Sequence, residues 1–333
     1  MKTKKSILVS VLLAFSLIVS ACGGSSSETS GASASNFPTK QVKLVIPYPP
    51  GGGTDVLFRL IASYAEKHLG QTIVPANMGG ATATIGSREV KDARADGYTI
   101  LGTHQVIATA QHTGIVDYGF ADFQPVAQVT STPHLPLVSK KFAEDNNIET
   151  LNDFIEYVRA NPGTVLWAYT VGSEDHYTIA ALLDQAGVDP RSMKYVNYPG
   201  TGPQYAALVA DQVHGMTGDY ASGRGYIEEG NAIALAVVDE ERNPYLPDVP
   251  TAKEQGIDFA VTVDRGLLAP KGTPIELIEA LQEAFDKALA DPELQEKIEE
   301  LGSFARYKPH DEYSDFLTDL DATMGLLADK MKF

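Results

Sequence analysis

The sequence predicts an α/β protein of two lobes, each a mostly parallel β-sheet flanked by helices, with a hinge and a central cleft between the lobes. Three observations predict this class. Short apolar runs of strand length alternate with longer segments whose apolar residues recur at helical spacing. Glycine-containing turns follow the expected ends of several strands. Segments near Pro133 and near Arg265 divide the strand–helix series into sets, as expected where a chain crosses between lobes.

The first set of elements has the order β-α-β-α-β. Its first helix is expected to end at Gly70, a glycine in the C′ position, and Asp96-Gly97 forms a turn before the third strand. This order is typical of a sheet with parallel strands covered by helices. We expect strands at residues 42–46, 72–74 and 98–101 and helices at residues 54–69 and 85–93.

A second set of strands and helices follows Pro133. We expect strands at residues 135–138, 164–169, 193–198, 213–217 and 232–238 and helices at residues 151–160, 177–186 and 204–211. A strand at residues 261–269 then leads to three amphipathic helices at residues 275–290, 292–301 and 311–331, which we expect to pack on the first lobe. The first lobe would therefore be discontinuous, with residues 37–134 and 265–333, and the second an insertion of residues 135–264.

The N-terminal residues 1–21 have the features of a secretory signal, with lysines near the start and then an uncharged apolar run. Val19-Ser20-Ala21-Cys22 resembles the lipobox of bacterial lipoproteins, in which the cysteine is lipidated and becomes the mature N-terminus. Cys22 is the only cysteine, so no internal disulfide can form; an ordinary signal with a chance cysteine is the alternative. Residues 22–36, rich in Ser, Gly and Ala, are expected to tether an extracytoplasmic globule to the lipid anchor.

Composition and motifs exclude several classes of function. Removing the three lysines of residues 1–21 takes the formal net charge from −17 to −20, whereas nucleic-acid binding needs a basic face. A small anion is not excluded, because oriented backbone N–H groups in a cleft can hold a carboxylate. The sequence has no G-x-S-x-G, no H-E-x-x-H and no paired Cys/His metal spacing, so we expect no enzyme, no metal site and no cofactor.

The segment Pro47–Asp55 joins the first strand to the first helix and holds three consecutive glycines. Glycine lets the backbone approach a ligand closely, and a helix N-terminus carries partial positive charge. A strand, a glycine turn and a helix start in this order therefore indicate an anion site. No Gly-Lys-Ser/Thr follows, and the G-x-G-x-x-G spacing is absent, which excludes a P-loop. The alternative is a tight structural turn in which Asp55 caps the helix.

Four further turns share this geometry. The segment Thr170–His176 follows a strand and opens a helix with Ser173 as the natural N-cap; the alternative is that Ser173 only caps and His176 is a buried polar residue. Because ligands bind outside the carboxyl ends of strands in open α/β sheets, the five turns can face one crevice. Asp219 is a candidate acid catalyst, helix cap or ligand acceptor. The remaining turns are Gly102-Thr103-His104, Pro199-Gly200-Thr201-Gly202 and Gly218-Asp219-Tyr220.

Five motifs occur in order between residue 37 and the C-terminus. They are IPYPPGGGTD at residues 46–55, GATATIG at 80–86, DGYT at 96–99, LPDVPT at 246–251 and LAPKGTP at 268–274. Together they resemble the receptors of tripartite tricarboxylate transporters. The resemblance implies a type II periplasmic-binding fold and a carboxylate held largely by backbone N–H groups of the Gly51–Asp55 and Gly172–Ser173 loops, often with ordered water. It also implies a large and a small membrane subunit as partners.

The chain departs from the family pattern at several points. Tyr48 stands where Phe is commoner, and residues 80–84 are less glycine-rich than usual. Glu174 and Asp175 place acids next to the second loop, where they would repel a second ligand carboxylate or hold a ligand amine. The residues expected to bind the ligand are Tyr48, Gly51, Gly52, Gly53, Thr54, Asp55, Thr103, His104, Thr170, Gly172, Ser173, His176 and Asp219.

These inferences predict a monomeric solute receptor that closes on a di- or tricarboxylate or a related organic acid and delivers it to a membrane transporter. Two alternatives stay open: a sensory receptor that signals to a membrane kinase, and a cell-surface hydrolase on the same lobes. Neighbouring genes for two membrane subunits favour transport, and an adjacent histidine-kinase gene favours sensing. Hydrolysis requires turnover of the bound carboxylate.

Overall fold

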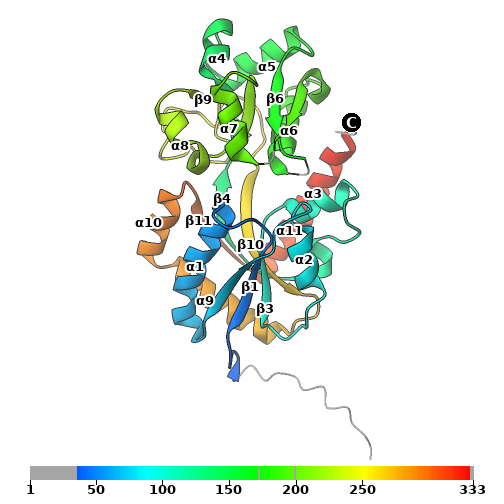
Figure 1. The fold of residues 1–333 in the computed structure, drawn as a ribbon, viewed down its shortest axis with the longest axis vertical. Helices are drawn as coiled ribbons and strands as arrows, with labels where there is room; N and C mark the ends of the chain where they lie inside the picture. The colour runs from blue at the N-terminus through cyan, green and yellow to red at the C-terminus, as the bar shows by residue number, and fades with distance from the viewer. Residues whose placement is uncertain (1–35, 172, 199, 331–333) are drawn as a thin grey trace, which may run out of the picture.

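The computed structural model describes residues 36–171, 173–198 and 200–330, which form two lobes stacked along the long axis of the molecule (Figure 1). The first lobe, at the bottom of Figure 1, has a six-stranded sheet in the order β11-β4-β10-β3-β1-β2. Its strands are β1 (Val42–Ile46), β2 (Ile73–Asn77), β3 (Thr99–Thr103), β4 (Phe123–Pro133), β10 (Thr262–Pro270) and β11 (Phe304–Pro309). Its helices are α1 (Gly53–Leu69), α2 (Thr84–Lys91), α3 (Val106–His112), α9 (Ile275–Leu289), α10 (Pro292–Glu300) and α11 (His310–Lys330).

The second lobe has a five-stranded sheet in the order β7-β6-β8-β5-β9. Its strands are β5 (Leu135–Ser139), β6 (Leu166–Tyr169), β7 (Lys194–Asn197), β8 (Gly215–Gly218) and β9 (Ala232–Ala234). Its helices are α4 (Lys140–Asn146), α5 (Leu151–Ala160), α6 (Glu174–Gln185), α7 (Thr201–Val209) and α8 (Tyr220–Glu228).

The α/β class and the two-lobed fold are confirmed, but both sheets are mixed rather than mostly parallel. In the first lobe, β1 pairs in parallel with β2 and β3, whereas β10 is antiparallel to β3 and β4, and β11 to β4. In the second, β6 is parallel to β7 and β8, and β5 is antiparallel to β8 and β9. The crossings explain the difference. Strand β4 carries the chain out of the first lobe and β10 carries it back, so these neighbours run in opposite directions (Figure 1).

Local sequence signals place several helix ends correctly. Helix α5 spans the predicted residues, and Thr150 caps it: its Oγ1 accepts a hydrogen bond from the Asp153 N–H at 3.1 Å. The Asp153 carboxylate accepts from the Thr150 N–H at 2.9 Å in return. Helix α1 ends at Gly70, which has the left-handed φ of 74° that a C′ glycine adopts readily.

Among the strands and α-helices of the described residues, five have no counterpart among the predictions: β4, β11, α3, α4 and α8. Strand β4 is buried on both faces along most of its length, so polar residues such as Gln128 interrupt any alternation of apolar and polar positions. Helix α8 contains Gly223 and Gly225, and glycine disfavours a helix interior. The secondary structure of these segments therefore depends on tertiary packing rather than on a local sequence pattern.

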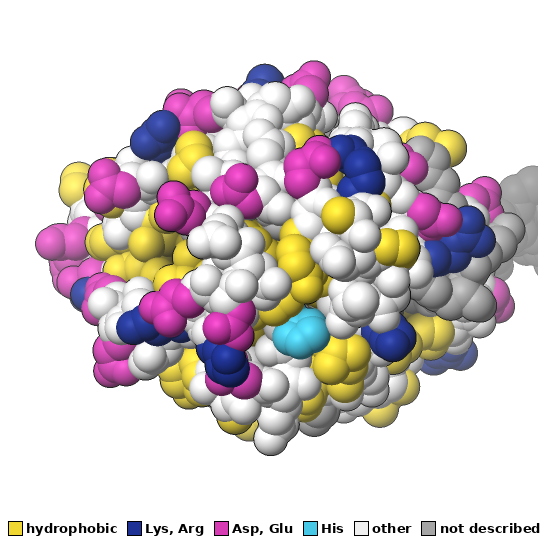
Figure 2. Space-filling view, turned by 90° about the horizontal axis from the view of Figure 1, so that it is seen from above, with side chains coloured by type: hydrophobic (Ala, Val, Ile, Leu, Met, Phe, Trp, Pro, Cys, Tyr) yellow, Lys and Arg dark blue, Asp and Glu magenta, His cyan; other side chains and the backbone are white. Residues whose placement is uncertain are grey.

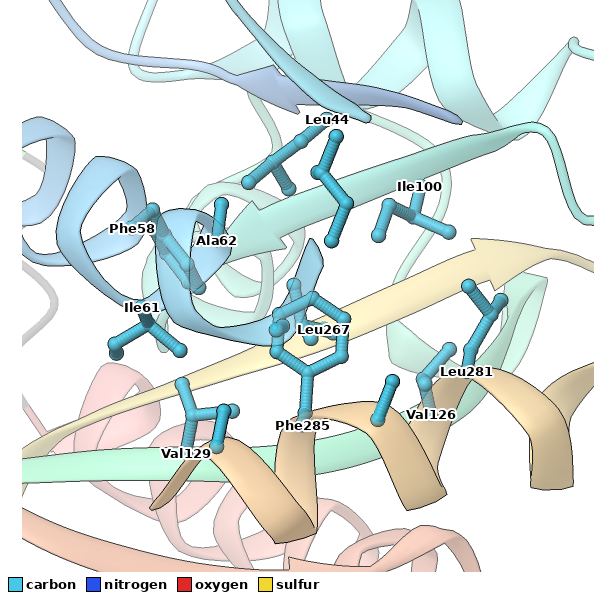
Figure 3. Packing of buried hydrophobic residues seen from close by; sticks show 14 of the residues in the cluster. Leu44, Phe58, Ile61, Ala62, Ile100, Val126, Val129, Leu267, Leu281 and Phe285 are labelled. Carbon is cyan, nitrogen blue, oxygen red and sulfur yellow. The ribbon is translucent and has the colours of Figure 1, made fainter. Parts of the chain in front are cut away.

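The core of the first lobe holds α1 and the sheet together as one unit. Figure 3 shows Phe58 and Ile61 of α1 beside Leu44 and Leu267 of the sheet and Phe285 of α9. None of the five side chains is more than 1 % exposed. Full burial of each side chain contributes about 1.5–3 kcal/mol to stability. This packing holds α1 against the sheet, with its N-terminal end just beyond the carboxyl end of β1.

Helix α6 contacts both lobes. Tyr177 and Ala180 join the buried cluster that holds Met324 of α11, while Leu182 belongs to the core of the second lobe. Any movement of one lobe against the other therefore has to slide α6 along α11.

The predicted signal and Cys22 lie outside the described residues, as does the predicted tether except for Asn36. Within the described ranges, no helix is both long and apolar enough to cross a membrane. Figure 2 shows acidic side chains spread over one face of the molecule, with Lys and Arg scattered among them. This distribution agrees with the strongly negative formal charge.

Candidate functional site

A cavity of about 870 Å³ lies between the two lobes and is lined by both. The structure brings most predicted site residues together there: Tyr48, Gly51, Gly52, Gly53, Thr54 and His104 from the first lobe and Thr170, Ser173 and Asp219 from the second. Asp55, Thr103 and His176 are buried behind this lining, and Gly172 lies outside the described residues. Glu174 and Arg265 also line the cavity, which makes Arg265 a site residue that the sequence did not indicate.

Asp55 organises the glycine loop of the first lobe. Its Oδ2 accepts a hydrogen bond from the Gly51 N–H at 2.8 Å, and its Oδ1 accepts from Arg59 Nε and Asn77 Nδ2, each at 2.8 Å. Burial opposes the charged form, but these hydrogen bonds, chiefly those from Gly51 and Asn77, hold the pKa of Asp55 below its usual value. Asp55 therefore bends the loop back onto the helix start instead of facing the cleft.

The first turn of α1 keeps backbone donors for a ligand. The N–H groups of Gly53, Thr54 and Asp55 are the first of the helix and have no intrahelical acceptor. In the part of the chain that the structure describes, no other backbone or side-chain acceptor receives them. Successive N–H groups at the positive end of a helix dipole form an anion site.

Arg265 of β10 places a cation at the same point. Its Nε donates to Thr54 Oγ1 at 3.0 Å and its Nη1 to Thr132 Oγ1 at 2.6 Å. A Cβ added at Gly53 would lie 3.9 Å from Nη2, so the guanidinium faces the glycine loop. Arg265 is 8 % exposed, yet no Asp or Glu oxygen among the described residues lies within 4.0 Å of it.

A buried guanidinium beside a helix N-terminus is electrostatically unfavourable without an anion, because both carry positive charge. Burial lowers the pKa of Arg265 from its usual value, and the charges of Asp219 and Glu174 across the cleft oppose this. A carboxylate between Arg265 and the loop would accept from both. The only sequence signal for this role is the pair of charged residues Asp264 and Arg265 inside the apolar segment 261–269.

Asp175 organises the corresponding loop of the second lobe. It accepts hydrogen bonds from the Thr170 N–H at 3.1 Å, from the His176 N–H at 2.7 Å and from Gln204 Nε2 at 2.9 Å. Ser173 Oγ donates to it as well. Burial raises the pKa of Asp175 to about 6, against the effect of these hydrogen bonds. Its oxygens are occupied within the protein, so Asp175 shapes the loop.

Two predicted helix caps differ in how they act. Ser173 occupies the N-cap position of α6, but its side chain makes no capping bond because its hydroxyl turns to Asp175. Asp219 caps α8: its Oδ1 accepts from the Ser222 N–H at 2.8 Å and its Oδ2 from Ser222 Oγ at 2.6 Å. Asp219 also lines the cleft, so a ligand donor can still reach it.

Tyr48, His104 and Glu174 form a contact between the lobes. The His104 ring stacks on Tyr48 with centroids 4.7 Å apart and planes 9° apart, and Tyr48 Oη lies 3.2 Å from Thr103 Oγ1. His104 Nδ1 lies 3.5 Å from Glu174 Oε1. Burial lowers the pKa of His104 to about 4, although the charge of Glu174 acts against the shift. His104 is therefore neutral at pH 7.

The described residues contain no group of three or more His, Cys, Asp or Glu side chains placed to hold a metal ion. What the cleft does offer is a cation and free N–H groups on one side and carboxylates on the other. This arrangement is suited to binding a small charged solute.

The family model described as the tripartite tricarboxylate transporter family receptor matches residues 57–332. The chain belongs to this receptor family. A protein encoded between tcbD and tcbE in Pseudomonas sp. (strain P51) is 32% identical over 271 residues, which cover 80% of this chain and 79% of that protein.

Two solved structures of proteins from Rhodopseudomonas palustris match most of the chain. MatC with bound malate is 31% identical with a TM-score of 0.72, over 88% of this chain and 100% of that one. A second protein, with adipate, is 27% identical with a TM-score of 0.75, over 88% and 98%. The predicted resemblance to the tricarboxylate transporter receptors is confirmed, and with it a solute-binding receptor rather than an enzyme.

The buried His104 makes stability depend on pH. The pKa of His104 is about 4 in the folded protein and about 6.5 in an unfolded chain, so the unfolded state binds the proton more tightly. The contribution is complete above pH 6.5 and is lost as pH falls toward 4, by up to about 3 kcal/mol. We expect His104→Phe, which keeps a ring against Tyr48, to lose correspondingly less stability between pH 7 and pH 4.5 in urea unfolding. His68→Phe, at an exposed histidine, is the matched control; equal losses in wild type and His104→Phe would exclude this origin.

Proposed function

We propose that this chain is an extracytoplasmic solute-binding lipoprotein that captures a small carboxylate and delivers it to the membrane subunits of a tripartite transporter. The ligand is a di- or tricarboxylate or a related organic acid. The observation that carries the proposal is Arg265, a buried guanidinium against the free N–H groups of Gly53 and Thr54 that has no acidic partner among the described residues.

The site gives one ligand carboxylate several charge-assisted hydrogen bonds. Each such bond contributes about 1.5–3 kcal/mol, and the partly dehydrated cleft strengthens them. Malate and adipate in the two Rhodopseudomonas palustris structures are both dicarboxylates, which supports a ligand of this class. His104, Thr170 and Asp219 line the cleft and would contact the rest of the ligand.

We further infer that residues 37–134 and 265–333 move as one lobe and residues 135–264 as the other. In the described part of the chain, two connections join the two sheets: β4 to β5, and the segment leading into β10. Two connections of this kind form a hinge, and the lobes would close on the ligand by rotation about it while α6 slides along α11. The lobes fold as one chain and no second copy is needed to complete the cleft, which supports a monomer.

Calorimetry with carboxylates and their amides tests the proposed ligand class. The panel contains acetate, malate, adipate and citrate, with acetamide, malamide and adipamide as neutral counterparts of similar shape. We expect at least one carboxylate to bind and every amide to bind at least tenfold more weakly, because an amide lacks the charge that Arg265 needs. Equal binding of an acid and its amide would contradict the proposal. Carboxylate uptake by cells that produce the membrane subunits, with and without this chain, tests delivery.

Lipid attachment at Cys22 is a separate expectation, motivated by the lipobox-like Val19-Ser20-Ala21-Cys22. Several acyl chains on one cysteine anchor a protein stably. We expect the wild type to incorporate labelled fatty acid and to sediment with membranes, and Cys22→Ser to do neither. Unlabelled wild type with the same fractionation as the variant would rule out the anchor.

A further inference from the structure

The two sides of the cleft carry opposite charges that do not neutralise each other. Arg265 and the start of α1 make the first-lobe side positive, whereas Glu174 and Asp219 line the second-lobe side. All three charged side chains line the same cavity, yet no ion pair within 4.0 Å joins Arg265 to either acid. An incoming solute would therefore meet a fixed cation on one wall and fixed anions on the other.

Glu174 differs from Asp175, its neighbour in sequence. Asp175 accepts four hydrogen bonds from its own lobe, which accounts for its burial. Glu174 is 8 % exposed, but among the described residues its one close titratable neighbour is the neutral ring of His104, with Nδ1 at 3.5 Å. Its Oε2 is buried and has no hydrogen-bond partner in the described part of the chain. A buried carboxylate oxygen without a donor is costly, and this cost calls for a partner from outside the protein.

Four backbone donors of the second-lobe loop and the start of α6 are engaged within the protein. The N–H groups of Thr170 and His176 donate to Asp175, that of Val171 donates to Asn197 Oδ1 at 3.1 Å, and that of Ser173 to the Thr170 carbonyl. A second carboxylate at this loop would lie close to the charge of Glu174 and be repelled. A protonated amine there would supply the missing donor and the opposite charge.

We propose that the cleft selects a carboxylate that also carries an ammonium group, with the carboxylate at Arg265 and the ammonium at Glu174. The contact between His104 and Glu174 spans the two lobes, so opening the cleft separates these side chains and uncovers Oε2 for the amine. This inference rests on the proposed carboxylate site, because Arg265 sets the orientation of the ligand. The two adjacent acids then have different roles: Asp175 holds the loop, and Glu174 recognises the ammonium group of the ligand.

Calorimetry with matched pairs tests the inference. The pairs are L-aspartate with succinate and L-glutamate with glutarate, which differ only by the amine. We expect the amino member of at least one pair to bind about 10- to 150-fold more tightly, as one charge-assisted hydrogen bond would give. Glu174→Gln, which keeps the shape of the side chain, should remove that preference and leave succinate or glutarate bound as well as before or better.

The outcomes separate the two proposals. If succinate and glutarate both bind wild type as tightly as their amino counterparts, the ammonium site is overturned and the carboxylate site is left standing. If no member of either pair and no carboxylate of the earlier panel binds, both proposals fail. The wild-type comparison needs no variant, so a Glu174→Gln protein that fails circular dichroism would not prevent the test. A folded Glu174→Gln that keeps the full preference would also overturn the assignment.

Discussion

Replacing Arg265 by glutamine is expected to weaken carboxylate binding by about 30- to 5,000-fold. Truncating one partner of a buried charge pair typically costs about 2–5 kcal/mol, and each 1.4 kcal/mol is about tenfold in affinity. The glutamine side chain can still donate a hydrogen bond, but it cannot supply the charge. Titration calorimetry with the tightest ligand of the panel measures the change, and circular dichroism checks the fold.

Arg306→Gln is the matched control for this variant. Arg306 lies on β11 outside the cavity lining and pairs with Asp239 at 3.3 Å, so the variant also loses a guanidinium and an ion contact. We expect its affinity to stay within about twofold of wild type. A folded Arg265→Gln protein that binds as tightly as Arg306→Gln would contradict the assignment of Arg265 to the ligand.

Gly53→Val is expected to weaken carboxylate binding by about 100-fold or more while the protein stays folded. The backbone at Gly53 does not have a positive φ, and a Cβ there meets no atom closer than Arg265 Nη2 at 3.9 Å. The backbone and its surroundings therefore accommodate the Cβ of a valine at this position. Its methyl groups would instead fill the space between Arg265 and the loop that a ligand carboxylate needs, so they remove both sets of hydrogen bonds.

Gly51→Ala separates strain from loss of ligand space. Gly51 has a φ of +83°, which costs an L-residue about 1–2 kcal/mol, but a Cβ there points into open space. We expect this variant to lose stability in urea unfolding and to keep most of its affinity, the reverse of Gly53→Val. If Gly53→Val binds as tightly as wild type, or both variants lose affinity only in proportion to stability, the loop does not hold the ligand.

The sequence indicates the two candidate ligand loops because their signals are local. Three glycines at the start of one helix, or a serine and two acids at the start of another, lie within ten residues of each other. The same holds for α5, whose Thr150 and Asp153 make its cap within a single turn. Strand β4 carries no such signal because both of its faces are buried. The mixed character of the sheets also escapes a local pattern, because strand direction depends on where the chain returns.

Arg265 could not be assigned from the sequence for a related reason. It reaches Thr54 across 211 positions of the chain, and this contact exists only because β10 lies between β3 and β4 in the first-lobe sheet. The adjacent acids Glu174 and Asp175 are equivalent in sequence terms. Only the packing shows that one accepts four hydrogen bonds while an oxygen of the other is left without a donor.

A crystal structure of the protein with its tightest-binding carboxylate tests the central claim most directly. We predict ligand carboxylate oxygens within about 3 Å of the N–H groups of Gly53 and Thr54 and of Arg265 Nη2. A ligand whose carboxylate lies against the second-lobe loop, with Arg265 left without an anionic partner, would contradict it.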